Sequence, residues 1–156
     1  MWRPDRRRGR AGWRAAAVLL ALAPGAAAAE GTSGPALDYA VTCQGCHRAD
    51  GAGTPGTVPP LAGSVGRFLG VPGGREFLVR VPGVAQAPLD DAALAAVLNW
   101  MLARFGRDDV PKGLVPYTAE EVGRLRGRPL TDVAGARRQL ARAIERAKQA
   151  GERARR

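Results

Sequence analysis

Cys43-Gln44-Gly45-Cys46-His47 contains both cysteines and the only histidine of this 156-residue chain. Two thiols three positions apart on a helical turn can add to the two vinyl groups of one porphyrin, and the adjacent imidazole then lies against one face of the ring. For this reason C-x-x-C-H is the signature of covalent haem attachment, and imidazole is a usual protein ligand of haem iron. The motif predicts one haem c, bound through thioethers at Cys43 and Cys46, with His47 as its proximal iron ligand.

A redox-active dithiol, a zinc site and a structural disulfide are the other interpretations of this motif, and each fits the sequence less well than haem attachment. A thioredoxin-like C-x-x-C requires a βαβ context, and no alternating or β-branched run flanks this one. A structural zinc site requires a fourth ligand, but the chain has no further Cys or His. A disulfide across so short a loop leaves His47 without a role.

The residues around the motif predict helices joined by a loop. Pro35, with Ser33 or Gly34 before it as the cap, indicates a helix start. Leu37 and Val41 share a face, as do Tyr39 and Cys43, so this helix can lay an apolar stripe on the haem or on a partner helix. The stretch RADGAGTPGTVPPLAG (48–63) is rich in Gly and Pro and predicts a loop.

A later helix is indicated by a cap and by apolar periodicity. Asp90 is a good N-cap, and Gly106 is expected to end the helix. Apolar side chains recur between them at helical spacing: Leu94, Val97, Leu98, Met101 and Phe105.

Together these features resemble a class I c-type cytochrome. Beside the attachment motif, the resemblance rests on Leu37-Asp38-Tyr39, Ala49-Asp50-Gly51-x-Gly53, Pro59-Pro60-Leu61-Ala62-Gly63 and the helix from Leu89 to Phe105. It covers residues 35–105. The resemblance implies an all-α fold wrapped round one haem, with the first and last helices crossing and Trp100 packed on the first helix. It also implies that the Pro59 carbonyl accepts a hydrogen bond from the second ring nitrogen of His47, which would raise the basicity of the ligand.

The sequence departs from this family where the sixth iron ligand is expected. Val81 stands at the position where class I cytochromes usually have Met, and valine cannot bind iron. Met101 is the remaining candidate, although its place in the apolar stripe explains it slightly better as a packing residue. Lys112, in a loop flanked by Pro and Gly, is a weaker candidate.

The first 29 residues predict an export signal. A basic segment is followed by a short apolar run from Ala15 to Ala23 and by small residues that end at Ala29. The run is well short of the ~20 residues that span a bilayer, and Pro24-Gly25 interrupts it. We therefore expect a signal peptide (1–29) rather than a membrane anchor, cleaved after Ala29, and a mature protein in the periplasm or an equivalent exported compartment.

The net charge of +10 is distributed unevenly along the chain. Residues 30–123 carry seven basic and ten acidic side chains, a net charge of −3, whereas residues 124–156 carry eleven and three, a net charge of +8. We expect a cytochrome c-like haem domain over 30–123 and a basic, Ala/Arg-rich tail, helical or partly disordered, over 124–156. Without a basic face on the haem domain, nucleic acid is not an expected partner.

The C-terminal third contains two further helix signals. Thr118-Ala119-Glu120-Glu121 is a capping box, and Thr131-Asp132 indicates the start of a longer helix. That helix has only a thin apolar stripe, formed by Val133, Leu140 and Ile144. Because so narrow a stripe buries little, a solvated and partly frayed tail is favoured over an arm that docks on an acidic partner or an anionic membrane.

The sequence thus predicts an electron-transfer protein rather than an enzyme: a monohaem one-electron carrier. By resemblance, its redox partners would be proteins such as an exported dehydrogenase or a terminal oxidase. The alternative is a haem-based sensor or ligand-binding module with an open sixth coordination position. A third, weaker interpretation is an enzyme subunit with the basic tail as its tether.

Overall fold

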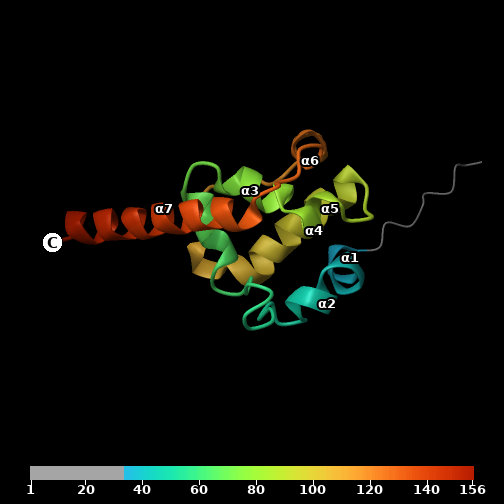
Figure 1. Cartoon of the computed structure of the whole chain (residues 1–156), viewed down its shortest axis with the longest axis horizontal. Coiled ribbons are helices and arrows are strands. Elements are labelled where there is room, and N and C mark those ends of the chain that lie inside the picture. The colour runs from blue at the N-terminus through green and yellow to red at the C-terminus, as the bar shows by residue number, and fades with distance from the viewer. Residues whose placement is uncertain (1–33) are drawn as a thin grey trace, which may run out of the picture. The chain divides into compact units, whose positions relative to one another are not determined.

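Ten helical segments follow one another in residues 34–156, the part of the chain that this computed structural model describes (Figure 1). They are α1 (Pro35–Thr42), α2 (Gln44–His47), η1 (Val65–Gly70), α3 (Gly74–Arg80), α4 (Pro82–Ala85), α5 (Asp91–Met101), η2 (Leu102–Gly106), η3 (Arg107–Asp109), α6 (Ala119–Arg126) and α7 (Val133–Ala154). The only β-pairing among these residues is an isolated bridge between Thr54 and Val58. The all-α prediction is confirmed, and the predicted signal peptide (1–29) lies outside the described residues.

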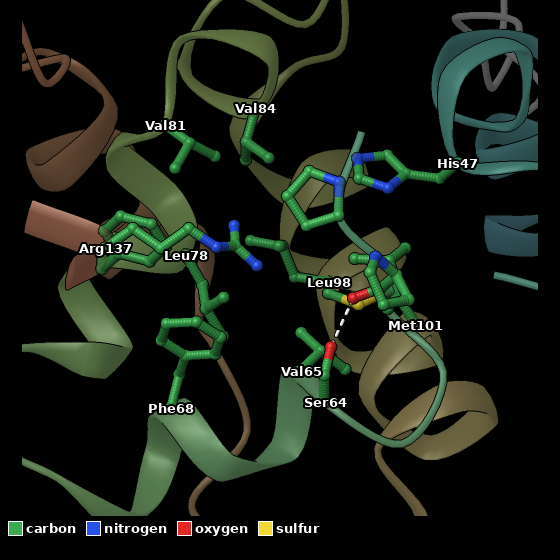
Figure 2. A pocket seen from close by; sticks show the side chains of 14 residues that line it. His47, Ser64, Val65, Phe68, Leu78, Val81, Val84, Leu98, Met101 and Arg137 are labelled. Atoms are coloured by element: carbon green, nitrogen blue, oxygen red, sulfur yellow. Dashed lines mark hydrogen bonds between the residues drawn. The ribbon is translucent and has the colours of Figure 1, made fainter. Parts of the chain in front are cut away.

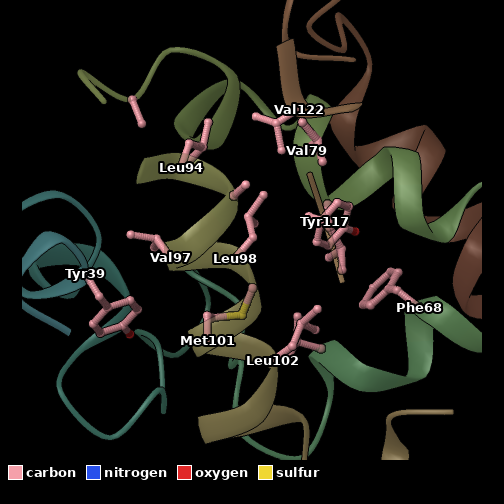
Figure 3. Packing of buried hydrophobic residues seen from close by; sticks show 14 of the residues in the cluster. Tyr39, Phe68, Val79, Leu94, Val97, Leu98, Met101, Leu102, Tyr117 and Val122 are labelled. Carbon is pink, nitrogen blue, oxygen red and sulfur yellow. The ribbon is translucent and has the colours of Figure 1, made fainter. Parts of the chain in front are cut away.

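Helix α5 lies at the centre of the hydrophobic core (Figure 3). Asp90 caps it as predicted, because its carboxylate accepts a hydrogen bond from the Ala93 N–H at 2.7 Å. The predicted apolar face is buried, and four of its side chains are at most 7% exposed: Leu94, Val97, Leu98 and Met101. Helix α5 packs against both α1 and α6, so it links the motif-bearing segment to the C-terminal segment.

An aromatic cluster joins α1 to the end of α5. The ring of Tyr39 lies 5.2 Å from that of Trp100 and 5.4 Å from that of Phe105. The packing of Trp100 on the first helix is therefore confirmed. Of the two predicted faces of α1, that of Tyr39 and Cys43 packs on the core cluster, whereas Leu37 and Val41 are exposed (56% and 76%) and do not pack on a partner helix.

The end of the late helix differs from the prediction. The α-helix ends at Met101 rather than running to Phe105, and the chain continues as a π-helical turn, η2. The wider turn still buries Phe105, whose carbonyl accepts a hydrogen bond from the Gly63 N–H at 3.1 Å. The turn thus fixes the end of the 48–63 loop against α5.

Arginine side chains attach the segment after η3 to the rest of the fold. The capping box is confirmed, since Thr118 accepts a hydrogen bond from the Glu121 N–H at the start of α6. Arg75 of α3 makes two 2.6 Å contacts to the Glu121 carboxylate. Arg126 of α6 donates to the carbonyls of Ala85, Ala87 and Leu89, at 2.6–3.0 Å. These bonds hold α6 to α3 and to the connection between α4 and α5.

Helix α7 has two unlike halves. Val133, Leu140 and Ile144 are partly buried against the core, so the first half is not a solvated tail, whereas every residue from 145 to 156 is exposed. The expected domain boundary between 123 and 124 falls inside α6, and the described residues 34–156 belong to one compact unit. Among residues 34–156, no helix combines the length and the apolar composition that a membrane-spanning segment requires.

Candidate functional site

The attachment motif forms one continuous helical turn. Helix α1 ends at Thr42, and the Cys43 carbonyl accepts hydrogen bonds from the Cys46 N–H at 3.2 Å and the His47 N–H at 3.0 Å. These bonds bring the two sulfur-bearing residues and the imidazole together on the same turn. Both thiols are free; Cys46 is exposed and Cys43 is partly buried. Burial raises the pKa of Cys43, and a hydrogen bond with Thr42 opposes that shift.

His47 projects from the end of this turn into a cavity that Pro59 also lines. Burial lowers the pKa of His47, the Pro59 carbonyl opposes this effect, and the charge of Arg137 adds to it. The Nδ1 atom is buried and has no hydrogen-bond partner at bonding distance. Burial therefore favours the neutral imidazole, which is the form that binds a metal, and the buried Nδ1 is available for a hydrogen bond.

The cavity has a volume of about 90 Å³ and mostly apolar walls (Figure 2). The apolar side chains include Val65 and Phe68 of η1, Leu78 of α3, Val84 of α4, and Leu98 and Met101 of α5. Phe68 stacks on Phe77 at 5.2 Å between ring centroids. Such walls suit the apolar faces of a porphyrin and limit the access of water to a bound iron.

The 48–63 loop folds closely beneath His47 because of one glycine. Gly53 has φ = 69°, and its N–H donates to the His47 carbonyl at 3.1 Å. A Cβ atom at this position would meet the carbonyl oxygens of Val58 and Pro59. Only glycine therefore allows the approach that sets Pro59 beside His47.

The donor set fits a covalently attached haem. The turn offers two free thiols at the spacing of the attachment motif, and His47 faces an apolar cavity with an unpartnered buried Nδ1. Cys43, Cys46 and His47 are the residues that would hold the group.

The residues considered for the sixth iron position lie in different places. Val81 and Val84 both line the cavity, so this stretch contributes hydrocarbon there. Met101 is 7% exposed and lines the same cavity as His47, next to Leu98 on α5. Lys112 is exposed, in the loop between η3 and α6, and does not line the cavity.

Arg137 is the cavity residue that the sequence interpretation missed. Its side chain enters from α7, and in Figure 2 it approaches from the side opposite His47. A signal was present in the sequence: residues 133, 137, 140 and 144 share one helical face, so Arg137 interrupts the apolar stripe that packs on the core.

Comparison with known proteins finds relatives but no matching family model. Cytochrome c-552 of Thermus thermophilus is 41% identical over 107 aligned positions, which cover 57% of this chain and 82% of the relative. A second cytochrome c-552, from a particular strain of the same species, is also 41% identical over 107 positions, which cover 72% of that protein. Identity at this level, over most of the length of both relatives, indicates common ancestry.

Proposed function

The chain belongs to the c-type cytochromes, and on this premise we propose that it carries single electrons between partner proteins outside the cytoplasm. Its cofactor is one covalently attached haem c. The observation that best supports a carrier is the placement of Cys43, Cys46 and His47 on one turn beside an apolar cavity. Haem iron supplies the one-electron chemistry by alternating between Fe(III) and Fe(II).

Each residue of the motif has a distinct role in this proposal. Cys43 and Cys46 hold the porphyrin through thioether bonds, so that the cofactor cannot dissociate after export. With haem bound, His47 would ligate the iron through Nε2 and its Nδ1 would donate to the Pro59 carbonyl, which would fix the ring and raise its basicity. The burial of Nδ1, and the effect of that carbonyl on the pKa of His47, support this assignment.

A direct test of attachment uses the full chain produced together with a cytochrome c maturation apparatus. We expect a mature mass equal to that of the polypeptide plus one haem, and a reversible one-electron titration. Replacing both cysteines (C43A/C46A) should abolish covalent haem, whereas Ser33→Ala, outside the motif, should not. A wild-type protein of polypeptide mass with no Soret band would contradict the proposal.

The sixth position of the iron separates the carrier from a second candidate function. Because Val81 and Val84 offer no ligating atom, a haem-based ligand-binding or sensor module with an open sixth position is the alternative. Met101 is the thioether within the same cavity wall, and its position among buried α5 side chains suits packing as well as ligation.

Spectra of the wild type and the Met101→Leu variant distinguish these two functions. If Met101 binds the iron, M101L should lose the near-infrared band of sulfur ligation in the oxidised form and should bind carbon monoxide faster when reduced. If Met101 only packs, M101L should leave both measurements unchanged. Rapid carbon monoxide binding by the wild-type protein would favour the ligand-binding module over the carrier.

Export is the part of this function that rests on the N-terminal sequence. The signal-like residues 1–29 support secretion with cleavage after Ala29, and a haem domain that begins at residue 30. N-terminal sequencing of the mature haemoprotein from the periplasmic fraction should begin at Glu30. Recovery of uncleaved protein in the membrane fraction would instead indicate a retained anchor.

The partners we propose are redox proteins of the same compartment, such as an exported dehydrogenase or a terminal oxidase. Residues 145–156 are all exposed and carry five basic and two acidic side chains, so they suit an acidic protein surface better than an apolar one. Electron-transfer rates of wild type and a variant lacking 145–156 should converge as salt is added. Equal electron-transfer rates of the two proteins at low salt would show that residues 145–156 do not dock on the partner. Binding of the wild type, but not of the deletion variant, to anionic vesicles would indicate that these residues bind a membrane instead.

A further inference from the structure

Arg137 is the only residue with a full positive charge among the fourteen that line the haem cavity. Figure 2 shows its side chain extending from α7 towards Leu98, with Val81 and Val84 on one side of it and Phe68 on the other. Within residues 34–156 the guanidinium has no carboxylate or carbonyl partner, and its contact is with the Phe68 ring, 5.4 Å from Cζ to the ring centroid. A cation is therefore held among apolar walls without an anion.

The other partly buried arginines of the described chain are all partnered. Arg75 pairs with Glu121, Arg80 donates to the Arg128 carbonyl at 2.7 Å, and Arg126 donates to three carbonyls and to Asp91. A partly buried charge without a partner is costly, and burial accordingly lowers the pKa of Arg137. The contrast indicates that the partner of Arg137 is not part of the polypeptide described.

The charged groups of neighbouring elements cannot supply that partner. Helix α7 packs against η1 and α3. The charged side chains of those two elements are Arg67, Arg75, Glu76 and Arg80, and none of them lines the cavity. Glu76 and Arg80 face the separate groove between α3 and α7.

We propose that Arg137 pairs with a carboxylate of the haem, which makes α7 a part of the haem site. This inference rests on the proposed function, because the haem brings the anions: its two propionates are its charged substituents. A guanidinium is suited to such a carboxylate because its fork of N–H groups can bind both oxygens. The first half of α7 is already fixed to the core by Val133, Leu140 and Ile144, so Arg137 is presented to the cavity from a rigid support.

The pairing has an electrostatic consequence that can be measured. A positive charge beside the haem disfavours the more positive Fe(III) state, and it lowers the pKa of the carboxylate that it binds. Loss of the charge should therefore lower the midpoint potential. It should also move the pH range in which the potential depends on pH to higher values.

The test compares Arg137→Gln with Arg138→Gln in the mature haemoprotein. Arg138 is the next residue of α7, is exposed, and its replacement removes the same charge. We expect covalent haem in both, with a lower potential and a shifted pH profile only in R137Q. Arg137→Lys keeps the positive charge but not the paired N–H groups of the guanidinium, and should restore much of the midpoint potential. This variant replaces R137Q in the comparison if R137Q folds poorly.

Three results would overturn or separate the claims. Equal potentials and pH profiles in R137Q and R138Q would exclude the pairing. If potentials and pH profiles are equal in the two variants but azide binds more weakly to R137Q alone, Arg137 interacts with an anion at the iron. That result would also exclude the pairing with the haem carboxylate. Absence of covalent haem from the wild type would contradict the proposed function itself, whatever the variants do.

Discussion

The motif-bearing segment and the C-terminal segment reach the same cavity, which His47 and Arg137 both line, by different means. Residues 34–63 are shaped by backbone turns: the carbonyl of Cys43 closes the motif turn, and Gly53 lets the loop approach His47. Residues 115–156 are attached by side chains, chiefly by arginines that reach backbone carbonyls and the carboxylates of Glu121 and Asp91. The first kind of structure depends on local conformation, and the second on contacts distant in sequence. The two segments should therefore respond differently to substitution.

The largest effect is expected at Gly53, on the motif side. Gly53→Ala combines a left-handed conformation with a collision against two carbonyl oxygens, and should cost about 4 kcal/mol of folding free energy. Gly56→Ala is the matched control, since φ is 77° there but nothing lies within 4 Å of the added Cβ. It should cost only about 1 kcal/mol. Guanidinium unfolding of the two haemoproteins measures the difference. Equal costs would show that the close approach to Pro59 is unimportant.

The matching change on the C-terminal side is at Arg126. Its side chain is 18% exposed and donates to the carbonyls of Ala85, Ala87 and Leu89 as well as to Asp91. Arg126→Gln leaves most of these acceptors without a partner, so we expect a loss of about 3 kcal/mol in unfolding free energy. Arg128→Gln removes an exposed charge on the same segment and should change stability by less than about 0.5 kcal/mol. Similar losses in both variants would mean that charge, rather than these bonds, attaches α6.

The same difference explains what the sequence could predict. The attachment turn, the caps at Asp90 and Thr118 and the packing of Trp100 were predictable, because each depends on residue types at short, fixed spacing. The contacts of Arg75 and Arg126 were not, because their acceptors lie 35–46 residues away in sequence and are mostly backbone carbonyls. Every residue has a carbonyl, so such a partner leaves no mark on the sequence.

The site itself shows the same limit. The absence of Met at position 81 could be read from the sequence, but the position of Arg137 in the cavity wall required the packing of α7 on η1 and α3. The π-helical turn after Met101 was also missed, since Leu102, Phe105 and Gly106 continue the helical pattern without marking a change of hydrogen bonding. Local signals predicted the elements, and long-range packing decided which of them share the site.

Acid should weaken the C-terminal attachment through Glu121. Arg75 holds the pKa of Glu121 below its usual value, and both side chains are less than 25% exposed. A lowered folded-state pKa means that the stabilisation is present above the unfolded-state value and is lost as the pH falls through the folded-state value. The unfolding free energy of the wild type should exceed that of Glu121→Gln by about 2 kcal/mol at neutral pH, and the difference should disappear as the pH falls below the usual range of a glutamate carboxyl.

The control for this pH dependence is Glu120→Gln, on the exposed side of the same helix turn. Its unfolding free energy should follow that of the wild type over the whole pH range. A wild-type advantage over E121Q that persisted at the lowest pH would mean that shape or packing at position 121, and not its ionised carboxylate, holds α6 to α3.

The smallest effect on stability is expected from removing residues 145–156. This deletion compares the exposed second half of α7 with the first half, which packs on the core. All of these residues are exposed, so their deletion should change the unfolding free energy by less than about 0.5 kcal/mol, although the helical circular dichroism signal should fall.

Deletion of 133–156 also removes Val133, Leu140 and Ile144 from the core and should be clearly destabilising. Because the shorter deletion keeps Arg137, it should also leave the midpoint potential near that of the wild type. A substantial loss of stability from the shorter deletion would mean that the attachment of α7 extends beyond Ile144, and that its exposed half does more than offer charge to a partner.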